Sequence, residues 1–432
     1  MLNQLIRTGG ASAVWVLLTA TPGVAETPGA GSEAAPESAV ESAGAAWTQW
    51  GGVDRNFRAE SSGLADAWGD GGPATLWSRE LGDGYSAILV EGGRLYTMYR
   101  RDEQEVVVSL DASSGKTVWE RPYDASPAEG HVDQFGRGPR ATPLIVGDVL
   151  YTIGIAGHLH ALDKGTGDVV WKRDLWREFG GNFLNHGYSS SPIVYKDMVI
   201  ALVGGEGKSL VAFGAADGDV RWQAQSFGNS YSTPQVYDVG GRPQLITFMK
   251  SQVVGINPDN GGLEWSYDHE NQWGQNINQP TLVDGEYLFF SSPQAGAHGV
   301  KLTRGGDGKI SLEELWSTRK IQFYHVTSVL DGDTVYGSTG TQVSFMAAVD
   351  VKTGEIRWRQ RGMAKSNVIE ADGKLFVLDE NGMLYVTKAT PEKLEVLDEV
   401  QVLERPAWTV PTIVGKTMYL RDKKHIKALD LG

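Results

Sequence analysis

The stretch Leu162-Asp163-Lys164-Gly165-Thr166-Gly167-Asp168-Val169-Val170-Trp171 decides the fold of this 432-residue chain. One alternating apolar run, residues 158–162, comes before the aspartate, and a second, residues 168–171, follows the last glycine. Alternation with a period of two predicts β-strands. An aspartate accepts bonds from nearby backbone N–H groups, and a glycine adopts positive φ without strain. The stretch therefore predicts a tight hairpin that joins two strands.

The unit Leu-Asp-x-x-(Ser/Thr)-Gly-x-x-x-Trp recurs along the chain. Clear copies end in Trp119, Trp171 and Trp358, and looser copies keep a glycine and the tryptophan. The full tryptophan series comprises Trp77, Trp119, Trp171, Trp222, Trp265, Trp316 and Trp358, spaced 42 to 52 residues apart. This spacing is typical of a propeller blade of four strands, roughly 40–50 residues. We expect each indole to pack against the neighbouring blade, where its burial contributes a few kcal/mol.

Two inner strands precede each hairpin, as in the apolar runs that follow Pro143 and Pro192. An eighth outer strand, without tryptophan, is predicted at residues 394–400. The last strand, residues 426–430, then lacks an outer partner, and the strand at residues 75–81 lacks inner ones. We expect these two strands to pair, which removes exposed sheet edges. The prediction is an all-β fold, an eight-bladed β-propeller of four-stranded antiparallel blades closed by its N- and C-terminal strands.

Composition excludes several classes of function. The chain has 39 Lys+Arg against 53 Asp+Glu, a net charge of −14, which disfavours nonspecific nucleic-acid binding. It contains no cysteine, so disulfides, iron–sulfur clusters, cysteine-ligated zinc, cysteine nucleophiles and a lipobox anchor are excluded. We expect no nucleic-acid partner, no membrane span and no lipid anchor.

The N-terminal residues predict export. Residues 1–25 resemble a signal peptide: Arg7 precedes an apolar stretch at residues 11–21, and Gly23 and Ala25 supply small residues for cleavage. Residues 26–46, rich in Ala, Gly, Ser and Glu, predict a disordered linker. The propeller is expected to span residues 47–432, and the protein to be periplasmic or secreted.

The hairpin unit resembles the tryptophan-docking motif of the pyrroloquinoline-quinone (PQQ)-like β-propeller repeat family, and the opening Trp47-Thr48-Gln49-Trp50-Gly51-Gly52 is similar to that family's N-terminal segment. The resemblance covers about residues 47–432. It implies a propeller that serves either as a quinone-dependent alcohol dehydrogenase or as the non-enzymatic propeller lipoprotein of outer-membrane β-barrel assembly. Fold alone does not choose between these. The adjacent cysteines of the dehydrogenases and the N-terminal cysteine of the lipoprotein are both absent here.

A ligand site is predicted where the loops between blades gather around the central channel. Three of these loops are long, residues 122–139, 176–188 and 267–277. One polar or aromatic residue before each inner strand is expected to converge on the channel mouth. The candidate binding residues are Arg140, His186, Tyr188, Tyr231, Asn276, Asn278, His325 and Trp408, and Tyr85, Arg137, Tyr324 and Asn367 occupy similar positions.

No catalytic or metal-binding residue is assigned. Quinone chemistry would need a cation such as Arg140, and the carboxylates of Asp268 and Glu270 with Asn271 would supply oxygens to Ca²⁺. A solvated acidic loop explains these three residues better. Strand packing is the better explanation for His158 and His160, and a hairpin turn is the better one for residues 303–314. No cofactor is predicted, and PQQ with Ca²⁺ stays open as an alternative.

The leading hypothesis is an exported binding or interaction scaffold that holds an envelope protein or a small ligand on its loop face. Two alternatives remain open: a PQQ-dependent oxidoreductase, and a periplasmic module that binds a saccharide, a peptide or another small ligand.

Overall fold

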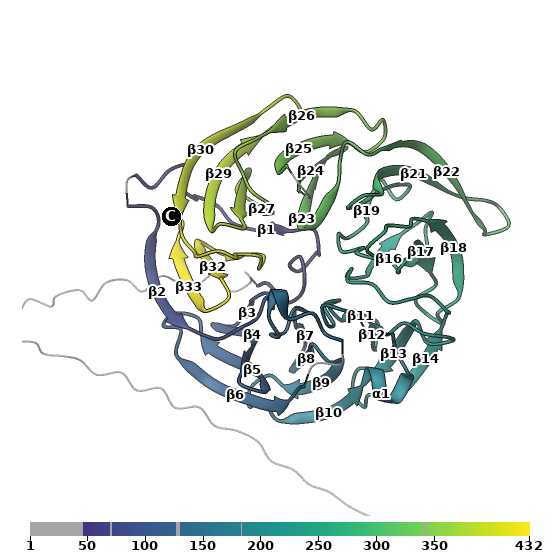
Figure 1. Cartoon of the computed structure of the whole chain (residues 1–432), viewed down its shortest axis with the longest axis horizontal. Helices are drawn as coiled ribbons and strands as arrows, with labels where there is room; N and C mark the ends of the chain where they lie inside the picture. The colour runs from purple at the N-terminus through teal and green to yellow at the C-terminus, as the bar shows by residue number, and fades with distance from the viewer. Residues whose placement is uncertain (1–45, 70, 127–129, 183, 341–342) are drawn as a thin grey trace, which may run out of the picture. The chain divides into compact units, whose positions relative to one another are not determined.

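A closed ring of eight β-sheets makes up the part of the chain that the computed structural model describes (Figure 1). The described residues are 46–432 without 70, 127–129, 183 and 341–342, and without the side chains of 325 and 326. The expected signal peptide and nearly all of the expected linker lie outside them. None of the helices in these residues is long and apolar enough to span a bilayer.

The first four blades follow one another in the sequence, and each is a four-stranded antiparallel sheet. Blade one consists of β3 (Leu89–Glu91), β4 (Arg94–Arg101), β5 (Gln104–Asp111) and β6 (Thr117–Asp124). Blade two consists of β7 (Leu144–Val146), β8 (Val149–Ile153), β9 (His158–Asp163) and β10 (Val169–Asp174). Blade three consists of β11 (Ile193–Tyr195), β12 (Met198–Leu202), β13 (Leu210–Gly214) and β14 (Val220–Ala224). Blade four consists of β15 (Gln235–Asp238), β16 (Pro243–Phe248), β17 (Gln252–Ile256) and β18 (Leu263–Asp268).

The next three blades repeat this order. Blade five consists of β19 (Thr281–Val283), β20 (Tyr287–Ser292), β21 (Gly296–Arg304) and β22 (Ile310–Thr318). Blade six consists of β23 (Phe323–Asp331), β24 (Thr334–Thr339), β25 (Phe345–Asp350) and β26 (Ile356–Gln360). Blade seven consists of β27 (Ser366–Ala371), β28 (Lys374–Asp379), β29 (Met383–Ala389) and β30 (Leu394–Gln401), with the short β1 (Arg58–Ala59) added in parallel to β27. The predicted hairpin at residues 303–314 is the turn between β21 and β22.

Blade eight is built from both ends of the chain. It consists of β31 (Thr412–Val414), β32 (Thr417–Arg421), β33 (His425–Asp430) and, as its outermost strand, β2 (Ala74–Glu80). β2 runs antiparallel to β33, and Trp77 lies opposite Ala428. Figure 1 shows the purple N-terminal strand lying along the yellow C-terminal one. The predicted closure of the ring, and the count of eight blades, are confirmed.

Six tryptophans join their blade to the next one through a hydrogen bond. The indole Nε1 of Trp119, on β6, donates to the backbone oxygen of Lys164 in the next blade at 3.0 Å. Equivalent bonds are made by Trp77, Trp171, Trp222, Trp316 and Trp358. Beneath each ring the neighbouring strand carries a small residue, such as Ala161 opposite Trp171. Small residues leave room for the indole to lie flat on its own blade while its edge reaches the next blade.

Trp265 is the exception among these tryptophans. Its Nε1 donates to the side-chain oxygen of Gln244 in its own blade, at 2.9 Å. The following blade has the long β21–β22 hairpin in place of the Asp-x-x-Thr-Gly turn. Trp265 is still buried among apolar residues of blades four and five, including Val300 and Leu302.

The hairpin aspartate works as the sequence predicts. In blade two, Oδ1 of Asp163 accepts from the backbone N–H groups of Gly165 and Thr166, at 2.9 and 2.8 Å. Gly167 follows at φ 76°. These local bonds fix the turn whose backbone carbonyl then receives the tryptophan of the preceding blade.

Two short helical segments lie in the loops between blades. The one-turn α1 (Leu175–Phe179) is capped by the Asp174 carboxylate, which accepts from the backbone N–H of Arg177, and it ends at Gly180 in the left-handed region. The 3₁₀ segment η1 (Asp133–Phe135) lies in the loop between blades one and two. The sequence predicted only long loops here, because five and three residues are too few to show a helical period.

Candidate functional site: the central well

A cavity of about 350 Å³ occupies the axis of the ring. We call it the central well. Its rim consists of Tyr85, Phe135, Arg140, His186, Tyr231, Asn278, Tyr324, Lys365, Asn367 and Trp408. Six of these residues stand one to four positions before the first strand of a blade, and Tyr324 and Asn367 are the second residues of β23 and β27. A ring of eight blades therefore brings them to one end of the channel.

The N-terminal segment, residues 47–59, closes the opposite end of the channel and forms the floor of the well. The backbone oxygen of Thr48 accepts from Ile145 N in blade two. At the other end of the segment, β1 pairs with β27 of blade seven, and the guanidinium of Arg58 donates to Leu330 O in blade six. The segment thus crosses the axis, as the purple trace in Figure 1 shows.

Four floor residues line the well: Trp50, Arg55, Asn56 and Phe57. The rings of Trp50 and Phe57 meet edge to face at 5.3 Å. The Arg55 guanidinium donates through Nε and Nη2 to the side-chain oxygen of Gln49. Burial lowers the pKa of Arg55 to about 10, and within the described residues the guanidinium makes no ion pair. The floor therefore presents a cation that has little water around it.

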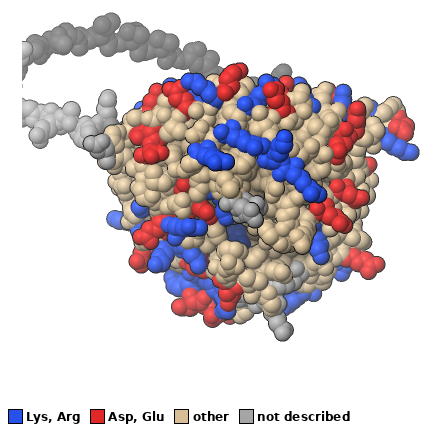
Figure 2. Space-filling model, turned by 45° about the horizontal axis from the view of Figure 1, so that its top comes forward, with Lys and Arg blue, Asp and Glu red and all other residues tan. Residues whose placement is uncertain are grey.

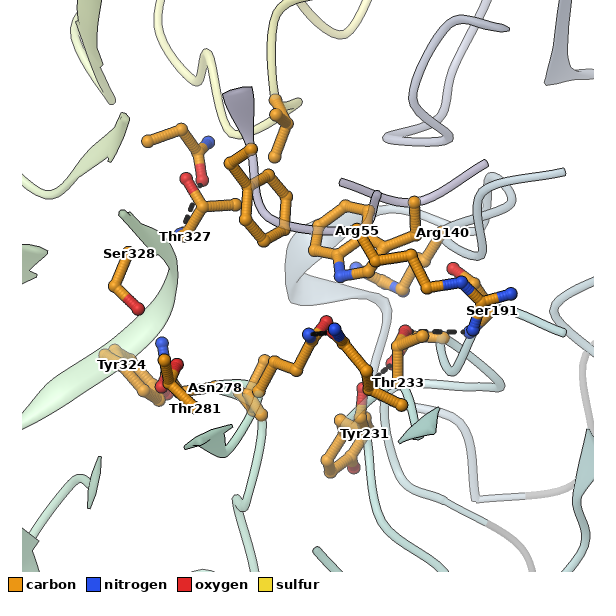
Figure 3. Close-up of a pocket in the computed structure, with 18 of the residues that line it drawn as sticks. Arg55, Arg140, Ser191, Tyr231, Thr233, Asn278, Thr281, Tyr324, Thr327 and Ser328 are labelled. Carbon is orange, nitrogen blue, oxygen red and sulfur yellow. Dashed lines mark hydrogen bonds between the residues drawn. The ribbon is translucent and has the colours of Figure 1, made fainter. Parts of the chain in front are cut away.

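Arg140 places a second guanidinium at the rim. It donates to Gly136 O at 3.0 Å and lies 5.5 Å from the ring centre of Tyr85. Its Nε is buried and makes no hydrogen bond, and no ion pair joins it to any described residue. Burial lowers the pKa of Arg140. Figure 3 shows Arg55 and Arg140 on one side of the well, across from Thr327 and Ser328.

His186 lies beside this guanidinium and Tyr231 on the rim. Burial, and then the positive charge of Arg140, lower the pKa of His186. Its backbone N–H donates to the Tyr231 hydroxyl at 3.4 Å, and its ring Nδ1 is buried without a partner. The imidazole is therefore neutral at pH 7.

A chain of aromatic rings lines the same part of the rim. Trp408 lies 5.4 Å from Tyr85 and 5.3 Å from Phe135, and Phe135 lies 5.2 Å from His186. Lys365 completes the rim; its ammonium lies 3.5 Å from the Glu380 carboxylate and 5.9 Å from the Trp408 ring. The wall is flat and aromatic, with cations at its edges.

None of the described residues that line the well carries a carboxylate. Figure 2 shows the hollow in the surface, with Lys or Arg atoms visible inside it. A Ca²⁺ site and a general base both need carboxylate oxygens, so the well does not fit the metal-assisted quinone chemistry considered from the sequence. Asn271 is used within its own loop, where its Oδ1 accepts from the backbone of Trp273 and Gln275. The described residues contain no cluster of three or more metal-ligating side chains.

The structure divides the predicted site residues into two groups. Arg140, His186, Tyr231, Asn278 and Trp408 line the well together. Tyr188 and Asn276 do not: the Tyr188 hydroxyl donates to Leu202 O in the wall, and the Asn276 amide donates to Met249 O. The side chain of His325 lies outside the described residues. Both wall residues alternate with a lining residue, so their position in the sequence alone could not separate them.

Several lining residues carried no clear signal in the sequence. Phe135 comes from η1, and Trp50, Arg55 and Phe57 come from the floor. Trp50 lies within the Trp47–Gly52 segment, and Arg55 and Phe57 follow it; the family resemblance of that segment was the one available hint. Lys365 directly precedes β27 and could have been found by the rule that located Asn367.

His158 and His160 lie outside the well. Their rings are 5.9 and 4.4 Å from the Tyr123 ring, between blades one and two. Burial lowers the pKa of His160 to about 4, so the side chain is neutral. The arrangement agrees with the packing role predicted for this pair.

The fold and site define a class: an eight-bladed propeller of the PQQ-like repeat type, with an axial well closed at one end. The model of the family described as outer membrane protein assembly factor BamB matches residues 102–360, more than half of the chain. The chain belongs to this family.

Curated relatives carry the same description. BamB of Shewanella oneidensis is 24% identical over 290 residues, which are 66% of this chain and 71% of the relative. BamB of Yersinia pestis is 25% identical over 267 residues, 57% of this chain and 63% of the relative.

Solved structures share the fold at low sequence identity. The crystal structure of BamB from Moraxella catarrhalis has a TM-score of 0.57 at 17% identity and covers 83% of this chain and 99% of that one. A europium-containing methanol dehydrogenase has a TM-score of 0.64 at 12% identity and covers 89% of both chains. The likeness to an enzyme is therefore one of architecture.

Proposed function

We propose that this protein is an exported, periplasmic interaction scaffold that holds a protein of the cell envelope on its loop face and so takes part in outer-membrane protein assembly. Membership of the BamB family is the observation that carries the proposal. The relatives it matches are described as assembly factors.

The loop face has a feature suited to holding a partner. Trp273, in the loop between β18 and β19, is 54% exposed. Its loop is anchored by the Asn271 side chain, which bonds the backbone of Trp273 and Gln275. A large aromatic side chain held on a rigid scaffold yet exposed to water is typical of an interface residue.

The oxidoreductase alternative receives less support. It rests on a likeness of fold to the dehydrogenases, and fold does not determine activity. The described lining of the well also offers no carboxylate that would act as a base.

Photo-cross-linking in living cells tests the proposal. A benzophenone amino acid replaces Trp273, Gln134 or Arg405 on the loop face, and Leu263 on the outer strand β18 as a control; all four positions are exposed. We expect a discrete cross-linked envelope protein from at least one loop position and none from residue 263. The proposal is wrong if the loop positions give no product, or the same products as the control.

A further inference from the structure

We propose that the central well binds a small organic anion, a carboxylate attached to a flat apolar body. This would be a second binding function, separate from the docking of a protein on the loops. The argument rests on the charge of the lining, on guanidinium nitrogens that make no hydrogen bond within the described residues, and on the shape of the wall.

The charge of the lining is opposite to that of the chain. The protein has a net charge of −14, with 53 acidic residues against 39 basic ones. The described lining of the well nevertheless contains Arg55, Arg140 and Lys365 and no Asp or Glu. Of these three cations only Lys365 forms an ion pair within the described residues, with Glu380 at 3.5 Å. The Asp83 carboxylate lies outside the lining but close enough to Arg140 to act against the lowering of its pKa. A low-dielectric cavity lined by charge of one sign concentrates ions of the other.

The two arginines retain donors for a ligand. Arg55 bonds Gln49 through Nε and Nη2, and Arg140 bonds Gly136 O through Nη2. Within the described residues, Nη1 of each guanidinium therefore makes no hydrogen bond. Nε of Arg140 is fully buried, so a carboxylate in the well would bond the terminal nitrogens. Guanidinium and carboxylate match in a bidentate geometry, and such charge-assisted bonds are among the stronger ones.

The aromatic wall of the well determines which apolar body the carboxylate should carry. Trp408, Phe135 and Tyr85 present a continuous aromatic surface beside Arg140. An inorganic anion would leave this surface uncovered, whereas a planar organic acid would cover it and bury apolar area. The cavity of about 350 Å³ is at the small end of the range for small-molecule sites. It therefore fits an acid of one or two rings.

Calorimetric titration of the purified full chain tests this proposal. The probes are benzoate, terephthalate and benzene-1,3,5-tricarboxylate, and the neutral diamide of terephthalic acid keeps the shape while removing the charge. We expect at least one acid to bind. The diamide should bind at least about tenfold more weakly than terephthalate. Arg140→Gln or Arg55→Gln should weaken acid binding by about tenfold or more, and Arg140→Lys should restore part of the loss at that position.

Arg137→Gln is the matched control. Arg137 is an exposed arginine in the loop between blades one and two, is paired with Asp133, and does not line the well. Acid binding should be unchanged in this variant, and thermal melting verifies that every variant is folded. The proposal is overturned if none of the acids binds at up to about 10 mM, if the diamide binds as well as terephthalate, or if folded Arg140→Gln and Arg55→Gln both bind like the wild type. The two proposals can fail separately. If the acids bind but position 273 gives no cross-link in cells, the ligand site is supported and the proposed function is contradicted.

Discussion

The indole ring of Trp77 lies so close to Gly115 that a Cβ on this glycine would come within 2.5 Å of the ring. The same relationship joins Trp119 with Gly167 at 2.6 Å and Trp316 with Gly354 at 2.4 Å. The turn glycine therefore has two roles. It adopts positive φ, and it leaves the space into which the preceding blade inserts its tryptophan.

The first prediction separates these two roles. Gly115→Ala places a methyl group in the left-handed region at φ 66° and against the Trp77 ring. Backbone strain of about 1–2 kcal/mol and overpacking of about 1–3 kcal/mol should together lower the free energy of unfolding by about 2–5 kcal/mol. Urea-induced unfolding measures this change.

Gly373→Ala is the control for the backbone contribution. Gly373 has nearly the same φ, 67°, and nothing within 4 Å of the position of its Cβ. Its loss of stability should be about 1–2 kcal/mol, the backbone strain alone. Equal losses in the two variants would show that the Trp77 contact is energetically unimportant.

The second prediction concerns the indole itself. Trp171 is 9% exposed, and its Nε1 donates to Ala215 O in the next blade at 2.9 Å. Trp171→Ala should lower the free energy of unfolding by about 3–5 kcal/mol, because it opens a cavity between two blades. Trp171→Phe removes the hydrogen bond but keeps most of the volume, so it should cost less. Thermal melting and urea unfolding measure both variants.

Trp273→Ala is the control, because it removes an indole that is exposed to solvent. Its stability should be unchanged. If Trp171→Ala and Trp273→Ala lower the melting temperature equally, Trp171 does not hold the two blades together.

The repeated hairpin made the fold predictable from the sequence. The tryptophan recurs seven times, and five turns carry a glycine that receives the indole of the preceding blade: Gly115, Gly167, Gly218, Gly261 and Gly354. These local signals agree with one another, so no single copy has to be perfect. The closing pair, β2 with β33, followed from counting strands. The rim was predictable for the same reason, since one position per blade converges on the axis.

The floor and the exceptions were not predictable. Residues 47–59 cross the channel through a few isolated contacts, such as that of Arg58 with Leu330, which leave no periodic pattern. Trp265 looks like the other tryptophans in the sequence, yet its partner depends on the hairpin of another blade. Tyr188 and Tyr231 are equally plausible mouth residues until the path of each loop is known. Contacts between segments distant in the chain decide all three cases.

The third prediction concerns pH. Glu105 is fully buried between blades one and two, where it accepts from Ile155 N at 2.9 Å and from the Tyr123 hydroxyl at 2.7 Å. Burial raises its pKa to about 7. In the unfolded chain the carboxyl titrates near its ordinary value of about 4.3. Between these values the folded state retains a proton that the unfolded state releases, so stability falls as the pH rises, by up to about 1.4 kcal/mol per pH unit.

Glu105→Gln isolates this effect, because the amide does not titrate and still accepts from Ile155 N. Urea unfolding at each pH gives the free energy of unfolding of the wild type and of the variant. The wild-type value minus the variant value should fall by about 2–3 kcal/mol between pH 4.5 and pH 8. Glu103→Gln removes an exposed carboxylate two residues away and controls for the change in net charge. A constant difference between wild type and Glu105→Gln would contradict the raised pKa.

The fourth prediction links stability to the central well. Arg55 is a desolvated cation that has Gln49 as its hydrogen-bond partner and no ion pair among the described residues. Burying a charge without a counter-charge costs free energy, so Arg55→Met should leave the free energy of unfolding unchanged or raise it by about 1 kcal/mol. The same variant should lose affinity for terephthalate.

Arg58→Met is the contrasting variant. In the wild type the Arg58 guanidinium bonds Glu370, Asp331 and Leu330 O, so its removal should lower the free energy of unfolding. Urea unfolding and calorimetry of both variants check the pair of outcomes. If Arg55→Met is strongly destabilised, the guanidinium supports the floor structurally; if it is stable but binds no acid, the charge is present for a ligand.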